Sequence, residues 1–216
     1  MTRYFAGEET ASQLGAAAAR QALAAAGVSL REVDALVCTG GTMQQPIPCN
    51  AALLAAALGA EADGLMTFDV NSTCLGFLTG LEVVSAQLAA GSFRRALIVA
   101  AEVGSPGLDW TQPESCAIIG DGAAAVLVES AGLNPDDADD PETGGPAPSG
   151  ILATAFQTWP AGAGLTAIRG GGSALPARNF TEEAAREFLF QMDGPGVFRM
   201  ASRLLPGFVR NFLDKG

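Results

Sequence analysis

Histidine is absent from this 216-residue sequence, and cysteine occurs at only four positions, 38, 49, 74 and 116. None of the four belongs to a C-x-x-C pair, and their spacing does not resemble a disulfide-dense scaffold. Zinc sites are built from histidine and paired cysteine ligands. The sequence therefore predicts reduced thiols and no metal site.

Positive charge is also scarce. Twelve lysine and arginine residues stand against 23 aspartate and glutamate residues, so the formal net charge is −11. Without a long basic block, the chain lacks the electrostatic footprint of a protein that binds nucleic acid or an anionic membrane. An acidic carrier protein would be repelled on average, so its docking site would have to be a local basic patch or lie outside this chain.

Long apolar runs are missing as well. The longest, such as Ala96 to Ala101, end well before the length that a bilayer requires. The first nine residues, MTRYFAGEE, lack the apolar core and the cleavage site of a secretory signal. We therefore expect no transmembrane helix and a cytoplasmic location.

Hydrophobic residues nevertheless make up 49% of the chain, which suits one large domain or two small ones. Helix and strand patterns alternate over the first 130 residues, and the run at 95–103 is almost continuously apolar, as in a strand covered on both faces. This pattern predicts an α/β fold whose mostly parallel sheet is covered by helices. The predicted helices are 9–26, 48–58 and 74–90, and the predicted strands are 33–39, 65–70, 95–103 and 123–129.

The rest of the chain is less regular. Residues 131–149 are rich in Asp, Pro and Gly, which predicts a flexible acidic loop between a first part, 1–130, and a second part, 150–216. The elements expected in the second part are a strand at 150–158, a glycine-rich loop at 161–178, a helix from Thr181 to Met192 and a helix at 197–214 interrupted by Pro206-Gly207.

Cys74 stands where a predicted strand ends and a helix begins. Helix N-terminal amides favour negative charge, so this position raises the thiolate fraction of a cysteine and could face the oxyanion of an attacked thioester. Cysteine is also among the most buried residue types and often acts as a small hydrophobe. The spacing by itself leaves both interpretations open.

The run Asp69-Val-Asn-Ser-Thr-Cys74-Leu-Gly-Phe77 resembles the D-x-x-x-x-C-x-G-F segment around the acyl-accepting cysteine of the ketoacyl-ACP synthase III family, which has a thiolase-like fold. Further landmarks agree in order. They are Glu9-Thr-Ala-Ser12, Pro48 before a helix, Ala90-Gly91 before a strand, Ile119-Gly-Asp-Gly-Ala-Ala-Ala125 and Met192-Asp-Gly-Pro-Gly-Val-Phe198.

This resemblance implies an acyltransferase. Cys74 would accept an acyl group from a thioester, its own backbone N–H would be one oxyanion donor, and Claisen condensation with a malonyl-type thioester would follow. The side chains of Ile47, Ile119, Leu165 and Phe190 fall where the family lines its acyl tunnel, with Ile47 reaching across a dimer interface; from the pattern alone, each is also explained as ordinary core. The implied substrates are acyl-CoA and acyl carrier protein thioesters, with no cofactor and with a homodimer as the assembly.

The resemblance also implies that parts of the family's enzyme are missing here. Its catalytic histidine and asparagine and its second oxyanion amide would follow Gly216, and its first strand, expected in the centre of the first sheet, would precede Arg3. Loss of a central strand would expose two edges. We therefore expect this chain alone to be inactive. The alternative is a non-catalytic subunit or remnant that pairs with a complete synthase.

Other polar and thiol side chains receive structural interpretations. Cys38, Cys49 and Cys116 lie in or beside apolar runs, which favours a packing role. Asp121 sits in a glycine-flanked turn, where a carboxylate usually accepts from neighbouring backbone amides. Glu102 ends a predicted strand and could titrate near the site, but a solvated or hydrogen-bonded carboxylate is the commoner outcome there.

Overall fold

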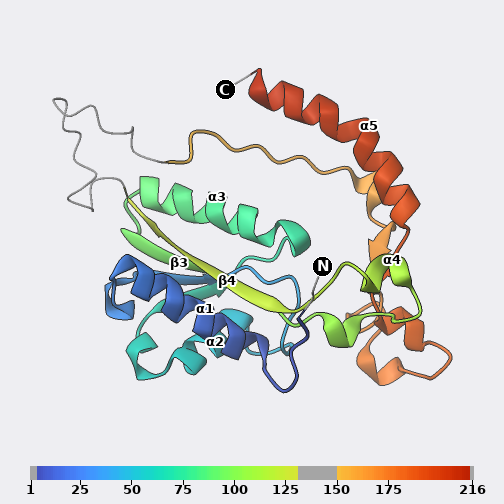
Figure 1. The fold of residues 1–216 in the computed structure, drawn as a ribbon, viewed down its shortest axis with the longest axis horizontal. Coiled ribbons are helices and arrows are strands. Elements are labelled where there is room, and N and C mark those ends of the chain that lie inside the picture. Colours follow the sequence, from blue (N-terminus) through green and yellow to red (C-terminus); the bar gives the residue numbers. More distant parts are fainter. Residues whose placement is uncertain (1–3, 131–149, 215–216) are drawn as a thin grey trace. The chain divides into compact units, whose positions relative to one another are not determined.

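The structure of the chain is a computed structural model, and it describes residues 4–130 and 150–214. The chain divides into two compact units (Figure 1). The first contains the described residues of Met1–Val103 and Asp121–Ile151, and the second contains Gly104–Gly120 and the described residues of Leu152–Gly216. The predicted boundary had placed all of 1–130 in one part, whereas residues 104–120 belong to the second unit.

The first unit is built on a four-stranded sheet with the order β2-β1-β3-β4. Strands β1, β2 and β3 are parallel, and β4 runs antiparallel to β3. The strands are β1 (Ala35–Cys38), β2 (Met66–Asp69), β3 (Arg95–Glu102) and β4 (Gly122–Glu129), and the helices are α1 (Ala11–Ala26), α2 (Asn50–Leu58) and α3 (Gly76–Ala89). The mostly parallel α/β architecture predicted from the alternating patterns is confirmed.

Helices cover both faces of this sheet, with α1 and α2 on one side and α3 on the other (Figure 1). Successive residues of a strand point to opposite faces. Leu36 accordingly packs with α1 and α2, whereas Val37 packs with Val84 of α3. All four residues of β1 are buried. This two-sided burial explains the near-continuous apolar runs of the sequence.

Local signals set the helix boundaries in this unit. Thr10 caps α1 through a reciprocal capping box with Gln13, and Gly27 ends the helix in the left-handed conformation with φ of 66°. A predicted gap in the middle of the sheet is not found. Each strand of the described sheet is hydrogen-bonded to its neighbour in the order, so the expectation of two exposed inner edges is wrong, whereas the absence of the family's first strand remains a prediction.

The second unit has little regular structure. It contains α4 (Pro113–Cys116), a two-stranded antiparallel sheet of β5 (Thr166–Ala167) and β6 (Gln191–Met192), and the long helix α5 (Gly194–Leu213). The strand predicted at 150–158 is not formed. That segment is almost entirely exposed, and β-type residues form a strand only where a partner strand and a packed face are available. The predicted loop 131–149 lies outside the described residues.

Two helix predictions in this unit are wrong. Thr181 does accept the N–H of Ala184, as a helix cap would, but only one 3₁₀ turn follows at Ala185–Phe188, because the next residues pair with Gly107 and with β5. Helix α5 begins at Gly194 rather than after the Gly-Pro-Gly break and continues through Pro206. Proline is tolerated in a first turn, but inside a helix it removes one hydrogen bond.

Candidate active site

Cys74 lies in a sharp turn between β2 and α3. Residues Thr73–Leu75 form one 3₁₀ turn, and α3 follows at Gly76. Thr73 has a φ of 48°, a left-handed conformation that costs a non-glycine residue on the order of 1–3 kcal/mol. Its N–H donates to Asn71 Oδ1 at 2.9 Å, which supports the turn. Cys74 therefore lies between a strand and a helix, as the sequence predicts, and the structure shows that it is exposed.

Two glycines bring α3 unusually close to the end of β1. A Cβ on Gly76 would lie 2.2 Å from the carbonyl oxygen of Thr39, and a Cβ on Gly80 would lie 2.4 Å from Thr39 Cγ2. Both glycines are buried. Glycine inside a helix costs about 1 kcal/mol relative to alanine. The G-x-x-x-G spacing therefore has a packing role, which holds the turn of Cys74 close to the sheet.

A loop that follows β1 also packs against this turn. Glu102, the last residue of β3, accepts hydrogen bonds from the backbone N–H groups of Gly41 and Thr42 and from the Thr42 hydroxyl. A Cβ on Gly41 would lie 3.3 Å from Thr73 Cα. Of the solvated and hydrogen-bonded states expected for Glu102, the structure shows the hydrogen-bonded one.

Asn50 and Asp69 hold the other end of the same loop. The buried Asn50 side chain donates to the carbonyl oxygen of Thr42 at 2.8 Å and accepts from the N–H of Gln44 at 3.0 Å. Asp69 accepts the N–H groups of Asn50 and Ala51 at 2.9 and 2.7 Å, at the N-terminus of α2. The carboxyl ends of the three parallel strands, β1, β2 and β3, therefore meet beside Cys74. This edge of the sheet is the usual place for a site in an α/β protein.

The other cysteines differ from one another in exposure. Cys38 is buried in β1, and burial raises the pKa of its thiol to about 11. Cys116 is partly buried. Cys49 is exposed as the N-cap of α2, so the expected packing role is wrong for this residue. Its apolar neighbours in sequence belong to the helix that begins one residue later, and they do not cover it.

Asp121 has the predicted structural role, with a distant partner. Its carboxylate accepts the N–H of Ala6 at 2.8 Å, and its own N–H donates to the carbonyl oxygen of Tyr4 at 2.8 Å. Asp121 therefore holds the segment before α1 by two hydrogen bonds, whereas the sequence predicts bonds to backbone amides next to it in the chain.

The predicted tunnel residues fall in both units. Ile47 lies on the loop before α2 in the first unit and is 84% exposed. Ile119, Leu165 and Phe190 are partly buried in the second unit, where Leu165 precedes β5 and Phe190 precedes β6. The structure brings these last two residues to one small sheet. Their role in an acyl tunnel with Cys74 remains a prediction.

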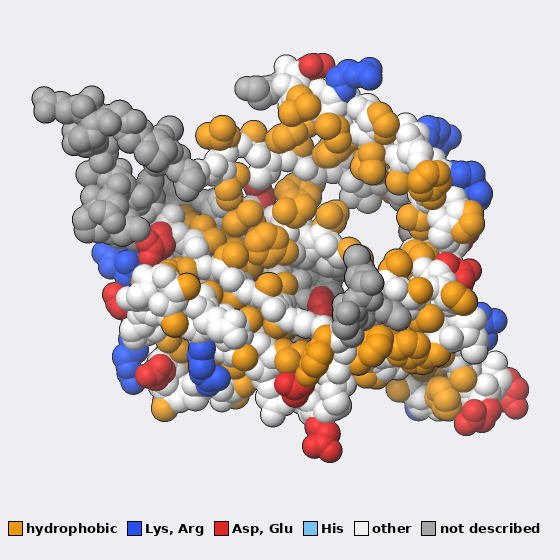
Figure 2. Space-filling model, viewed as in Figure 1, with side chains coloured by type: hydrophobic (Ala, Val, Ile, Leu, Met, Phe, Trp, Pro, Cys, Tyr) orange, Lys and Arg blue, Asp and Glu red, His pale blue; other side chains and the backbone are white. Residues whose placement is uncertain are grey.

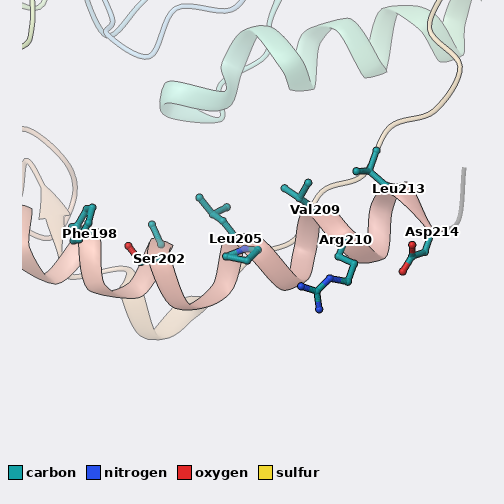
Figure 3. Close-up of a pocket in the computed structure, with 9 residues that line it drawn as sticks. Phe198, Ser202, Leu205, Val209, Arg210, Leu213 and Asp214 are labelled. Carbon is teal, nitrogen blue, oxygen red and sulfur yellow. The ribbon is translucent and has the colours of Figure 1, made fainter.

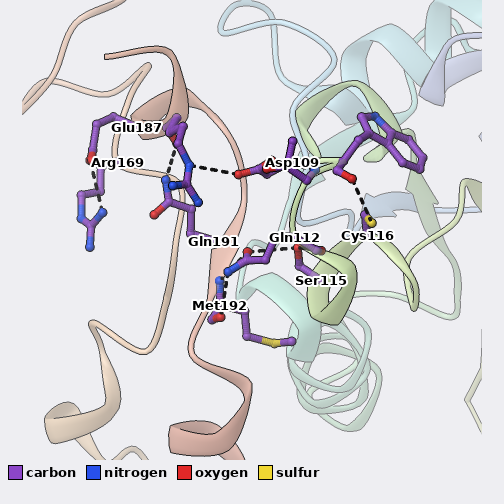
Figure 4. A network of polar contacts seen from close by, with 11 residues as sticks. Asp109, Gln112, Ser115, Cys116, Arg169, Glu187, Gln191 and Met192 are labelled. Atoms are coloured by element: carbon purple, nitrogen blue, oxygen red, sulfur yellow. Dashed lines mark hydrogen bonds and ion pairs between the residues drawn. The ribbon is translucent and has the colours of Figure 1, made fainter. Parts of the chain in front are cut away.

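A polar network joins the two sequence segments of the second unit (Figure 4). The side-chain amide of Gln112 donates to the carbonyl oxygen of Met192 at 3.2 Å and accepts a hydrogen bond from the backbone N–H of Met192 at 3.3 Å. It thus pairs with both backbone groups of Met192, as the backbone of a neighbouring strand would. Asp109 accepts from Thr111 and from Arg186 Nε, and the hydrogen bond from the Thr111 hydroxyl is the main cause that lowers the pKa of this carboxyl. Sequence reasoning had not identified this network.

An exposed apolar face runs along α5. Its side chains point to one side of the helix, and Arg210 points to another (Figure 3). The most exposed apolar members are Phe198, Leu205, Val209 and Leu213. Hydrophobic side chains gather along this helix in the space-filling view (Figure 2). Contiguous exposed apolar surface is typical of a segment that is covered by a further protein surface.

The described residues form neither a cluster of potential metal ligands nor a helix that could span a membrane. Within residues 4–130 and 150–214, no group of three or more potential metal ligands lies together. None of the helices in the same ranges combines the length and the apolar character needed to span a bilayer.

The family model and the curated relatives that match this sequence point to one family. The sequence model described as 3-Oxoacyl-[acyl-carrier-protein (ACP)] synthase III matches residues 68–139, which include Cys74. The chain is 35% identical over 213 residues to the beta-ketoacyl-[acyl-carrier-protein] synthase III of Novosphingobium aromaticivorans, covering 98% of this chain and 60% of that relative. Overall, the chain spans between 40% and 60% of the length of the curated relatives that it matches.

Solved structures show the same similarity. The 3-oxoacyl-[acyl-carrier-protein] synthase III from Aquifex aeolicus VF5 has a TM-score of 0.77 and 27% identity over 99% of this chain and 59% of its own. The corresponding synthase from Pseudomonas aeruginosa PAO1 has a TM-score of 0.75 and 30% identity over 98% of this chain and 58% of its own.

The helix-covered sheet and the cysteine at its strand-to-helix turn thus define a thiolase-like α/β protein. The agreement of the family model, the curated relatives and the structural neighbours is more specific. The chain belongs to the 3-oxoacyl-[acyl-carrier-protein] synthase III family.

Proposed function

We propose that this chain carries the acyl-accepting part of a 3-oxoacyl-ACP synthase III reaction, with Cys74 as the nucleophile. The observation that carries the proposal is the exposed position of Cys74 in the turn before α3, inside the segment that the family model matches. The Cys74 thiolate attacks the carbonyl carbon of an acyl thioester, the tetrahedral intermediate collapses, and the carrier thiolate leaves and takes up a proton. An acyl-enzyme thioester remains.

The proposed donors and acceptors are thioesters of coenzyme A and of acyl carrier protein, and no cofactor takes part. The relatives are named for the carrier protein, which supports this substrate class. The backbone N–H of Cys74 serves as an oxyanion donor, and Ile47, Ile119, Leu165 and Phe190 contact the acyl chain. The proposal places the chain in the cytoplasm.

Condensation requires groups that this chain does not contain. In the family, a histidine and an asparagine stabilise the carbanion formed from the malonyl thioester, and the present sequence has no histidine. Loss of one oxyanion donor typically costs about 10²–10³ in rate. The proposal therefore assigns acylation to this chain and expects no condensation by the 216 residues alone.

The experiment separates the two steps. Purified chain is incubated with a radiolabelled acyl-CoA, and acyl transfer is followed by intact mass and by label retained after denaturation. We expect one acyl group per chain, lost in Cys74→Ser and kept in Cys116→Ser. Malonyl thioester is then added, and no 3-oxoacyl product is expected. Transfer that persists in Cys74→Ser would overturn the nucleophile, and a Cys74-dependent 3-oxoacyl product would overturn the assignment of steps.

A second candidate is a non-catalytic subunit that pairs with a complete synthase. The absence of histidine and the exposed apolar face of α5 favour it. The acylation assay distinguishes the two, because a subunit that only shapes a neighbouring enzyme has no need to accept an acyl group itself.

Self-association is the remaining part of the proposal. The family resemblance predicts a dimer around Cys49, α2 and residues 95–103. Because β3 is paired on both sides in the sheet, it offers no free edge. The loop before α2 is the better candidate, since Met43 and Ile47 are 66% and 84% exposed. Sedimentation of the chain and of Ile47→Asp tests this contact: we expect a dimer that the aspartate weakens, whereas a monodisperse parent monomer would contradict it.

A further inference from the structure

We propose that Glu102 is a positioning residue for Cys74, acting through the backbone of Gly41 and Thr73. The inference concerns the geometry of the cysteine turn. It rests on the proposed function only in taking Cys74 as the reactive thiol.

The Glu102 carboxylate binds three donors from two successive residues. One oxygen, Oε1, accepts the N–H of Gly41, and the other, Oε2, accepts the N–H of Thr42 at 3.0 Å and the Thr42 hydroxyl. Hydrogen bonds to an ionised acceptor are roughly twice as strong as neutral ones. Because both oxygens are used, the carboxylate fixes the direction of this backbone segment as well as its position.

The segment that Glu102 holds lies between β3 and the cysteine turn. A Cβ on Gly40 would meet the carbonyl oxygen of Ala101 at 2.7 Å, and a Cβ on Gly41 would meet Thr73 Cα at 3.3 Å and the Thr73 carbonyl carbon at 3.4 Å. Neither position has room for a side chain without movement. The backbone of these two glycines therefore transmits the position of β3 directly to Thr73.

Thr73 is the residue that needs this support. Its φ of 48° is unfavourable for a β-branched residue, and such a conformation persists only where the surroundings over-determine it. The adjacent Asn71 side chain supplies one restraint. The Gly41 backbone supplies a second one, and Glu102 keeps it in place. Relaxation of Thr73 would turn the next residue, Cys74, away from its position before α3.

A purely structural carboxylate elsewhere in the unit provides a matched control. Asp34 accepts the backbone N–H groups of Arg94 and Arg95 at 2.7 and 3.0 Å, just before β3 begins, whereas Glu102 lies at the other end of the same strand. Both residues thus bind two successive amides. Replacing each with its amide makes the same chemical change at opposite ends of β3.

The test measures alkylation of Cys74 by iodoacetamide with peptide mass mapping, and Cys116 in the second unit serves as the internal standard. A carboxamide in Glu102→Gln turns an NH₂ group toward a backbone N–H, and Glu102→Asp keeps the charge but shortens the reach. We expect Cys74 alkylation to slow about tenfold in Glu102→Gln and about threefold in Glu102→Asp, because small misplacements of a reacting group are costly. Asp34→Asn should change the ratio of the Cys74 and Cys116 alkylation rates by no more than about twofold.

Each other outcome overturns the proposal. A charge effect alone would speed alkylation in Glu102→Gln and leave Glu102→Asp unchanged, and a general loss of stability would change the Cys74-to-Cys116 ratio equally in Asp34→Asn. If Glu102→Gln does not fold by circular dichroism, Thr42→Val replaces it. That variant removes one donor and should slow alkylation about threefold, beyond the range allowed to the Asp34→Asn control. Alkylation needs no acyl transfer, so a parent chain that fails to accept an acyl group would refute the proposed function and leave this test intact.

Discussion

Gly80 and Thr39 meet at the point where α3 crosses the end of β1. A methyl group on Gly80 would lie 2.4 Å from Thr39 Cγ2, and its next neighbours would be Thr39 Cβ at 3.7 Å and Ile98 Cγ2 at 3.8 Å. A single methyl group of Thr39 therefore leaves no room for even an alanine side chain at position 80 unless the packing shifts. This contact sets the distance between the helix that follows Cys74 and the sheet.

The first prediction is that Gly80→Ala destabilises the fold and that Thr39→Ser rescues it. Overpacking costs about 1–3 kcal/mol. Serine removes only Cγ2 and keeps the hydroxyl that donates to the carbonyl oxygen of Val99. Alone, it should cost about 1 kcal/mol for the lost methyl group. Urea unfolding of the two single variants and the double variant should give a coupling energy of at least about 1 kcal/mol.

Gly76→Ala is the control for this double-mutant cycle of Gly80→Ala and Thr39→Ser. Its methyl group would meet the backbone carbonyl oxygen of Thr39 at 2.2 Å, which no side-chain change at position 39 can move. We expect Gly76→Ala to be more destabilising than Gly80→Ala. Adding Thr39→Ser to Gly76→Ala should not restore any of the lost free energy of unfolding. Equal rescue of both glycine variants would contradict the packing that the structure shows.

The second prediction concerns the order in which the thiols react. Cys38 should be alkylated last, because it is buried and its pKa is raised to about 11, so that at pH 8 only about 0.1% of it is thiolate. Cys74 should be alkylated first. Cys49 is also exposed, but Asp69 already occupies the first amides of α2 beside it.

Limited iodoacetamide treatment with mass mapping gives this order. In urea, all four thiols should react at similar rates, which controls for differences between peptides. Faster labelling of Cys49 or Cys116 than of Cys74 in the folded chain would count against Cys74 as the nucleophile.

The third prediction is a pH dependence at Asp34. The backbone N–H groups of Arg95 and Arg94 lower the pKa of this carboxyl below its ordinary value of 3.8. A lowered folded-state pKa means that the unfolded chain binds the proton more tightly. The stabilisation is therefore fully present above pH 3.8 and is lost as the pH falls through the folded-state pKa.

Asp34→Asn should accordingly be less stable than the parent chain at pH 6, and the difference should shrink below pH 3.8. Urea unfolding midpoints at a series of pH values measure it. A difference that grows on acidification would show that the carboxylate does not bind these amides.

The first unit was largely predictable from sequence because its signals are local. Thr10 and Gly27 mark the ends of α1 by their own capping chemistry, and the apolar run of β3 shows burial on both faces. The second unit was not predictable in this way. Residues 181–192 have helical composition, but pairing with Gly107 and β5 determines their conformation, and such distant partners leave no local pattern.

In the candidate site, too, the features set by local sequence were predictable and those set by distant partners were not. The sequence by itself determined that Cys74 stands between a strand and a helix, since that position follows from neighbouring residues and from the motif around it. Only the tertiary structure decided that Glu102 holds Gly41 against Thr73 and that two glycines bring α3 onto Thr39. These contacts join residues 32 to 61 positions apart, and their energies depend on interatomic distances that the folded chain alone establishes.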